Sequence, residues 1–295
     1  MTAGTIMHPP MDIVTRISQR AAELRPAEQK VAQTVLGNIA EAAADSIQTL
    51  ARRAAVSEAS VTRFAKAMGC RDVRELKLQL AQAAAVGQRF LDSAASHPPS
   101  SADGILADIN QVLAANRALV RPAAFEQAAA RIAAARMVVV FGMGGGSTTM
   151  ADEARFRLAR LGRPVATYHD PVLQRMVAAT LGPQDVVLVL STTGQVPEII
   201  ASVNVAREYG APVVAITAIA SPLAALADEL LPVQALETDF IYKPSSSRYA
   251  MMMMIDVLAT EVALAQEGRS KELLRRIKYV LDAHRGGGDR QPLGD

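Results

Sequence analysis

The sequence has few of the residues that build covalent cross-links, metal sites or base-stacking platforms. Among 295 residues there are one cysteine, four histidines, no tryptophan and only 4% aromatic residues. The lone Cys70 allows neither an internal disulfide nor a cysteine-rich zinc site, so we expect no bound metal. The shortage of aromatic rings argues against a protein that stacks nucleic-acid bases on Trp or Tyr.

Long apolar runs are also missing. A membrane helix needs about 18 or more apolar residues, and the best candidate, 250–264, is broken by Asp256 and Glu261. The opening residues MTAGTIMHPP have neither the basic start nor the apolar stretch of a signal peptide. These absences predict a cytoplasmic protein without a membrane partner.

The apolar content and the distribution of charge are more informative. Half of the residues are apolar, which permits a packed core, and the length fits two domains. The net charge is only +2, but residues 46–80 carry seven bases against three acids. Such a local excess suits the phosphate backbone of a nucleic acid, although it is also common on a solvated helix face.

The hydrophobic periodicity changes near the middle of the chain. Residues 12–91 have apolar positions at helical spacing, and 92–135 follow as a Pro- and Ser-rich linker (94–103) and a connecting helix. From 136 to 285 short runs of Val, Ile and Leu alternate with helix-length segments, and we expect a disordered tail over 286–295. The five expected strands are 137–141, 164–168, 185–191, 212–217 and 229–234. The pattern predicts an all-α domain followed by a three-layer α/β domain with a five-stranded parallel sheet.

Residues 48–67, QTLARRAAVSEASVTRFAKA, have the pattern of a helix-turn-helix. Small buried residues in the first helix allow close crossing, Ser57 can cap the second helix, and Ala55 occupies a turn position where glycine is common. The second helix would present Glu58, Ser60, Thr62, Arg63 and Lys66 on its exposed face, where they suit base edges and phosphates. An ordinary helix pair within an all-α domain is the alternative.

Two polar loops follow expected strands. Glycines and hydroxyls at 142–148 come directly after the first strand, and Ser191-Thr192-Thr193-Gly194-Gln195 follow the third. Parallel strands bring both loops to one sheet edge, where backbone N–H groups and hydroxyls can hold a phosphate and sugar hydroxyls. The alternative is that these serines and threonines only cap helices.

A dinucleotide site fits the glycine loop less well. Ser147 stands where the third glycine of that fingerprint belongs, and Asp170 is too far along to serve as its ribose-binding acid. We therefore expect no cofactor.

At these residues both halves of the chain resemble the RpiR-type transcriptional regulators, which join a helix-turn-helix domain to a sugar isomerase (SIS) domain. The resemblance covers about residues 12–285. It is carried by Glu28, by LARRAAVSEASVTRFAKAMG (50–69), by the glycine loop with Ser147, by LARLG (158–162) and by the 191–194 loop. Within the family, YHDPVLQRM (168–176), the stretch around 238–242 and SSSRYAMMMMIDVLAT (245–260) look most like the regulators of hexose catabolism.

The resemblance implies a DNA-binding regulator of carbohydrate genes, expected to be a repressor, and not an enzyme. Its effector would be a phosphorylated sugar or sugar acid such as ketodeoxyphosphogluconate. The expected effector-binding residues are Gly144, Ser147, Thr148, Ser191, Thr192, Thr193, Gly194 and Glu198. Thr193 and Val196 depart from the hydroxyl pattern common in the family, which should alter phosphate recognition.

The expected DNA contacts divide into two groups. Ser60, Thr62 and Arg63 would lie nearest the bases, while Arg52, Arg53 and Lys66 would contact phosphates, with Ser57 at the helix start. Operators should be palindromic and the protein a homodimer or homotetramer. Met251–Met254 would contribute to that dimer or simply pack in the core.

Two other functions are compatible with the pattern. One is a sugar-phosphate isomerase or lyase with an accessory helical domain, in which Glu198 or His169 would move protons. The other is a binding module without DNA affinity.

Overall fold

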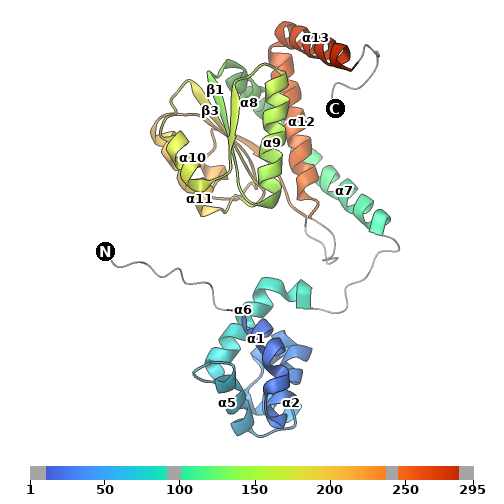
Figure 1. Cartoon of the computed structure of the whole chain (residues 1–295), viewed down its shortest axis with the longest axis vertical. Coiled ribbons are helices and arrows are strands. Elements are labelled where there is room, and N and C mark those ends of the chain that lie inside the picture. The colour runs from blue at the N-terminus through green and yellow to red at the C-terminus, as the bar shows by residue number, and fades with distance from the viewer. Residues whose placement is uncertain (1–10, 92–100, 237–244, 286–295) are drawn as a thin grey trace. The chain divides into compact units, whose positions relative to one another are not determined.

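The computed structural model describes residues 11–91, 101–236 and 245–285, which form two compact units (Figure 1). The first unit comprises 11–91, and the second comprises the remaining described residues. The expected tail, the stretch 238–242 and linker residues 94–100 lie outside the described ranges.

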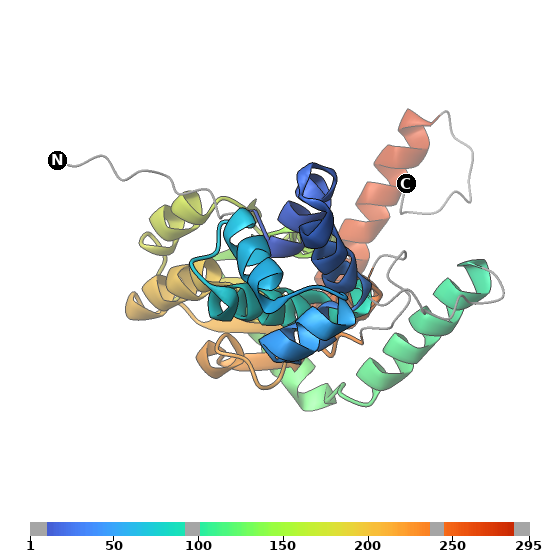
Figure 2. The ribbon, with the colours of Figure 1, turned by 90° about the horizontal axis from the view of Figure 1, so that it is seen from below.

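The first unit is entirely helical, as predicted (Figure 2). Its elements are α1 (Ile13–Arg20), a 3-10 turn η1 (Ala21–Glu23), α2 (Pro26–Gly37), α3 (Ile39–Ala44), α4 (Ile47–Arg53), α5 (Glu58–Ala67) and α6 (Val73–Leu91). Each helix buries an apolar stripe in one core, with Ile17, Val31, Phe64 and Leu76 fully inside. Side chains of Asp12, Asn38, Ser46 and Ser57 cap helix starts by accepting first-turn N–H groups.

The turn between α4 and α5 has the tight geometry of a helix-turn-helix. Ala55 adopts a left-handed backbone with φ 52°, the only described residue other than glycine with positive φ. The Val56 N–H then donates to the Ala51 carbonyl at 2.9 Å, and Ser57 caps α5. An alanine at this position carries the steric cost that a glycine would avoid.

The second unit is built on a parallel sheet in which each predicted strand is present. The strands are β1 (Met137–Gly142), β2 (Val165–Tyr168), β3 (Asp185–Ser191), β4 (Val213–Thr217) and β5 (Glu229–Pro232). They run parallel in the order β2-β1-β3-β4-β5, with Val138 paired to both Val165 and Val186. The adjacent β1 and β3 send their following connections to different sides of the sheet, which is the switch point where such sheets bind ligands.

Helices cover both faces of this sheet. They are α7 (Ser101–Arg117), α8 (Pro122–Ala134), α9 (Gly145–Arg160), α10 (Pro171–Ala178), α11 (Pro197–Glu208), the 3-10 turn η2 (Ala224–Leu226), α12 (Ser247–Ala265) and α13 (Glu267–His284). In Figure 1, α9 and α12 lie on one side of the strands and α10 and α11 on the other. Alternate β3 residues serve the two cores: Leu188 packs with α8, α9 and α12, and Val187 packs with α11. These are the three layers that the periodicity predicts.

The stretch expected to be a linker and connecting helix is largely part of this unit. Residues 101–103 belong to α7, and α7 and α8 are separate helices rather than one. Phe125 and Ile132 of α8 are buried in the core beneath the sheet. The Asn116 amide of α7 exchanges two hydrogen bonds with the backbone of Gln234, at 2.9 and 2.8 Å. Buried contacts therefore anchor both helices to the α/β fold.

The methionine run of α12 mainly serves the core. Met251 and Met254 are buried against α8 and α9, and Met252 and Met253 are only partly covered. Of the two expected roles, core packing therefore holds for Met251 and Met254, which helical spacing turns inward, and a dimer role for the rest of the run stays a prediction. No single helix in the described ranges is long and apolar enough to cross a membrane. Only α12 and α13 taken together have that length and apolarity, and a bend of 110° separates them.

We expect Ala55→Gly to stabilise the first unit by about 0.5–1 kcal/mol, because relief of left-handed strain outweighs the greater unfolded-state freedom of glycine. The matched control is Ala59→Gly, at an exposed position inside α5. It should lower the free energy of unfolding by about 0.5–1 kcal/mol. Calorimetry of the full chain measures both, and a lower midpoint for Ala55→Gly would contradict the account of the turn.

Candidate functional site

A cavity of about 410 Å³ lies where β1 and β3 end. Its lining comes from the glycine loop, the Ser/Thr loop and the start of α12: Met143, Gly144, Gly145, Gly146, Ser147, Ser191, Thr192, Thr193, Val196, Ser245, Ser247 and Arg248. The parallel sheet thus brings together the two loops that the sequence places 44 residues apart, counted from Ser147 to Ser191. Such a cavity has the size of a small-molecule site.

The glycine loop leads from β1 directly into α9. Gly142 has no room for a side chain, because a Cβ there would lie 2.4 Å from the Ser147 carbonyl oxygen. Gly144, with φ 74°, turns the chain so that α9 begins at Gly145. First-turn amides of a helix have no intrahelical carbonyl to bond, and they sit at the positive end of the helix dipole. This geometry suits an anion such as phosphate.

The Ser/Thr loop is held by its own hydroxyls. The Ser191 hydroxyl accepts the Gly194 N–H at 3.1 Å, and Thr217 of β4 donates to the Ser191 carbonyl at 2.6 Å. Gly194 is left-handed, and a Cβ on it would lie 2.1 Å from the Ser221 hydroxyl. The loop is therefore held in shape by its own hydrogen bonds, and the Ser191 hydroxyl, which accepts in this bond, keeps its proton for another acceptor.

Arg248 is a cavity residue that the sequence reasoning missed. It lies in the first turn of α12, is exposed, and its guanidinium is 5.1 Å from the Tyr249 ring centroid. Among the described residues no carboxylate lies within ion-pair distance of Arg248. The signal was present as Ser245-Ser246-Ser247-Arg248, a serine run followed by a base. Only the tertiary fold shows that this segment reaches the loops after β1 and β3.

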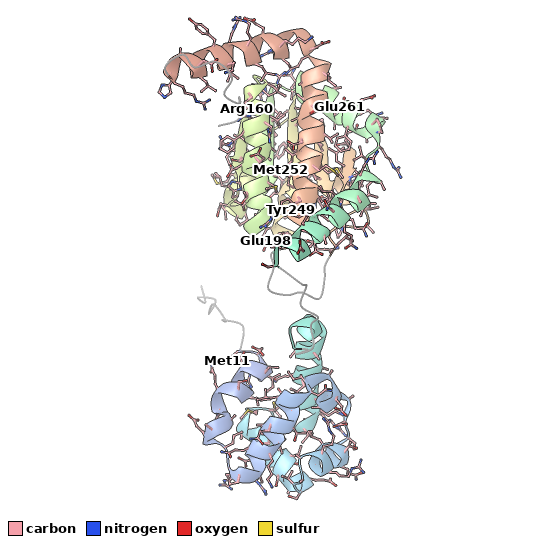
Figure 3. All side chains as sticks on the ribbon, turned by 90° about the vertical axis from the view of Figure 1, so that its right-hand side faces the viewer. Met11, Arg160, Glu198, Tyr249, Met252 and Glu261 are labelled. Atoms are coloured by element: carbon pink, nitrogen blue, oxygen red, sulfur yellow. The ribbon has the colours of Figure 1, made fainter. Side chains whose placement is uncertain are left out.

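Not every expected effector residue lines the cavity. Gly144, Ser147, Ser191, Thr192 and Thr193 do, whereas Thr148, Gly194 and Glu198 are absent from its lining. Gly194 shapes the loop instead. Figure 3 shows Glu198 at the same end of the unit as Tyr249, with Arg160 and Glu261 at the opposite end.

The candidate residues for proton transfer and for ribose binding have structural partners. His169 Nδ1 lies 2.9 Å from the Gly142 carbonyl oxygen, and since a carbonyl only accepts, this nitrogen donates. His169 Nε2 is 3.3 Å from Asp152. Burial alone would raise the pKa of Asp152, but a hydrogen bond from Thr167 and the neighbouring His169 and Arg155 bring that pKa below its ordinary value. Asp170, the ribose-binding candidate, caps α10 by accepting the Leu173 N–H at 2.8 Å.

No group of three or more acidic, histidine or cysteine side chains within the described ranges is arranged to hold a metal ion.

In the first unit, α5 presents most of the expected DNA-reading side chains. Ser57, Glu58, Arg63 and Lys66 are exposed, and Thr62 is half-buried. Ser60 differs from expectation: it is only 4% exposed, so it does not lie on the outer face. Its position at the third residue of α5 turns it toward the preceding Ser57 rather than toward solvent.

The two adjacent arginines of α4 have different environments. Arg53 forms ion pairs with Glu41 at 2.8 Å and Asp45 at 2.5 Å, which joins α4 to α3. Arg52 is exposed, and no described carboxylate lies within ion-pair distance of it, of Arg63 or of Lys66. Arg53 is therefore committed to the domain, whereas the other three cations are available to a polyanion.

Both halves of the chain match known domain families. Residues 11–87 match the helix-turn-helix domain of the rpiR family, and residues 131–261 match the SIS domain. The chain is 35% identical to the HTH-type transcriptional regulator HexR of Pseudomonas aeruginosa, over 92% of this chain and 95% of that protein. It is 31% identical to HexR of Escherichia coli, over 93% and 96% of the two chains.

A third relative is much longer. The Bifunctional protein glk of Burkholderia mallei is 33% identical over 88% of this chain but only 41% of its own length. Among solved structures, Vibrio vulnificus NanR complexed with ManNAc-6P has a TM-score of 0.59 at 21% identity, over 92% of this chain and 98% of that one. This likeness shows that the fold is shared.

The architecture is thus that of a helix-turn-helix regulator carrying a sugar isomerase domain. The chain belongs to the RpiR family of transcriptional regulators, and within it is similar to the HexR proteins.

Replacement of Gly194 tests how the cavity is shaped. We expect Gly194→Ala to destabilise the second unit by about 1–3 kcal/mol, because its Cβ would overlap Ser221 and Thr217 at a left-handed position. Gly144→Ala is the matched control, because Gly144 is also left-handed, with φ 74°, but nothing lies within 4 Å of its Cβ position. Thermal unfolding followed by circular dichroism compares them, and equal midpoints would disprove the close packing of this loop.

Proposed function

We propose that this protein is a transcriptional repressor of carbohydrate genes whose operator binding is controlled by a phosphorylated sugar or sugar acid. Membership of the RpiR family makes the chain a DNA-binding regulator of sugar metabolism. The finer proposal rests on one observation: the α9 N-terminus, the serine and threonine residues of two strand-end loops, and Arg248, which has no described carboxylate partner, meet in one cavity. We place its action in the cytoplasm, where operator DNA lies.

Each part of the cavity has a role in this proposal. The first-turn amides of α9 and the Ser147 hydroxyl hold the phosphate, and Ser191 and Thr193 bond the remaining oxygens. Thr192 also lines the cavity, but its hydroxyl donates to the Met251 sulfur at 3.2 Å. Arg248 offers a second positively charged group in the cavity lining, which suits a ligand with two anionic groups, such as ketodeoxyphosphogluconate. Thr148 and Glu198 stand outside the lining, so the proposal gives them no direct contact with the effector.

In this proposal the α5 surface binds the operator. Arg63 and Thr62 face base edges, while Arg52 and Lys66 contact phosphates. A helix-turn-helix covers one half-site, so a homodimer or homotetramer on a palindromic operator supplies the affinity. The effector controls binding through its different affinities for the DNA-bound and released arrangements.

An isomerase or lyase is less well supported. Moving a proton between adjacent carbons needs a base within hydrogen-bond reach of the substrate. Glu198 does not line the cavity, and His169 is engaged with Gly142 and Asp152. We therefore propose binding without turnover.

The effector site is tested by thermal shift with ketodeoxyphosphogluconate, glucose 6-phosphate and sulfate. We expect stabilisation by a phosphorylated sugar or sugar acid at concentrations where sulfate has no effect. Ser147→Ala and Arg248→Met should each weaken that ligand roughly tenfold or more, since charge-assisted hydrogen bonds are lost. Arg160→Met, at the opposite end of the unit (Figure 3), is the control. Equal stabilisation by sulfate, or unchanged affinity in both cavity variants, would refute the proposal.

The adjacent arginines of α4 separate DNA contact from domain stability. Arg52→Ala should lower the slope of log affinity against log salt by about one, because one phosphate contact is lost. Arg53→Ala should instead lower the free energy of unfolding by about 0.5–1 kcal/mol, because its two partners are carboxylates of the same domain. Fluorescence anisotropy with labelled DNA and thermal unfolding measure the pair. A salt slope lowered by Arg53→Ala alone would reverse the assignment.

A further inference from the structure

A short chain of polar side chains connects the start of α5 to Arg63. Ser57 Oγ and Ser60 Oγ lie 3.1 Å apart, and Arg63 Nη2 donates to Ser60 Oγ at 2.9 Å. Ser57 Oγ also accepts the Ser60 N–H at 3.3 Å as the helix cap. The middle member of this chain is buried, whereas its two ends are exposed.

The donors and acceptors in this chain can be assigned from chemistry. A guanidinium only donates, so Ser60 Oγ accepts from Arg63. The Ser60 proton is then available to Ser57 Oγ, so the buried hydroxyl both donates and accepts one hydrogen bond. Ser60 thus meets the requirement for a buried polar group through Arg63 and Ser57 together.

Helix capping alone does not account for this arrangement. Capping needs only the Ser57 hydroxyl and the Ser60 backbone N–H, and an alanine at 60 would serve equally well there. The side chains of residues three apart lie on the same helix face, which allows the Ser60–Arg63 bond. No described carboxylate competes for the Arg63 guanidinium.

The bond restricts Arg63 without occupying it. An exposed arginine has many rotamers, and their loss on binding opposes affinity. With one of its five N–H groups on Ser60, the guanidinium keeps four, and two suffice for the O6 and N7 atoms of a guanine. The buried Ser60 can therefore orient the Arg63 guanidinium before DNA binds, and enough N–H groups remain for a guanine.

We propose that Ser60 is a positioning residue that sets base discrimination by Arg63, and does not itself touch DNA. This inference rests on the proposed role of α5 in reading the operator, and it replaces the expectation that Ser60 contacts a base. Ser57 is the outer support, because it holds the Ser60 hydroxyl through their mutual hydrogen bond.

The first test needs no DNA. In the full chain labelled with 15N in arginine side chains, the Arg63 guanidinium should show slower rotation or slower hydrogen exchange than the guanidinium of an exposed arginine such as Arg52. Ser60→Ala should abolish that difference, and Ser60→Thr, which keeps the hydroxyl, should retain it. Identical Arg63 signals in the parent chain and Ser60→Ala would overturn the positioning contact, whatever the protein binds.

The second test is a double-mutant cycle on DNA. The parent chain, Ser60→Ala, Arg63→Ala and the double variant are measured on an operator and on copies with single base-pair changes. Ser60→Ala should reduce discrimination at one base pair about five- to tenfold, leave the salt slope on non-specific DNA unchanged, and have no further effect once Arg63 is alanine.

The control and the contrary results are distinct. Ser202→Ala removes another buried helical serine hydroxyl, one that donates to the Glu198 carbonyl, and should leave discrimination unchanged. Equal loss by Ser60→Ala with and without Arg63 would mean that Ser60 acts independently, and this overturns the inference. Unchanged operator binding by Arg63→Ala would instead refute the reading role of Arg63, while the nuclear magnetic resonance result still decides the contact.

Discussion

The parallel pairing of β1 with β3 is the constraint on which the cavity and its two loops depend. It places the carboxyl ends of two strands, separated by more than forty residues of chain, at neighbouring points on one edge. Because the chain leaves these strands toward opposite sides of the sheet, a gap opens between the following loops. The buried residues of β1 and β3, which pack on both faces, keep that edge in place.

Within this frame, glycines and hydroxyls have separate tasks. Gly142 and Gly194 stand where a Cβ would collide with neighbouring atoms, so they allow the loops to approach. The Ser191 hydroxyl accepts a hydrogen bond from the Gly194 N–H, and the Thr217 hydroxyl donates one to the Ser191 carbonyl. These bonds order the loop in the absence of a ligand. A loop that is ordered in advance loses little conformational entropy when a ligand binds. Arg248 adds a positively charged side chain, which neither of the two strand-end loops contains.

The helical unit shows a similar division between structure and recognition. Among its basic residues, Arg53 is bound to Glu41 and Asp45 and joins two helices, whereas its neighbour Arg52 remains available. Ser60 is buried, and the exposed Arg63 donates a hydrogen bond to its hydroxyl. The excess of positive charge over 46–80 therefore overstates the surface available to DNA, because some of that charge serves the fold.

Much of the architecture could be predicted from the sequence, because it depends on local patterns. The five apolar strand runs, the helical first unit and the Ser57 cap follow from periodicity and side-chain chemistry that act over a few residues. The two loops at one edge follow from parallel topology.

The tertiary structure alone decided which segments meet. It shows that Arg248 reaches the cavity while Glu198 does not, and that α8 belongs to the core. It also shows that Met251 and Met254 point inward and that Ser60 lies beneath Arg63. Those outcomes are set by packing between residues distant in sequence or by the rotation of one helix against its neighbours, and local patterns do not contain that information.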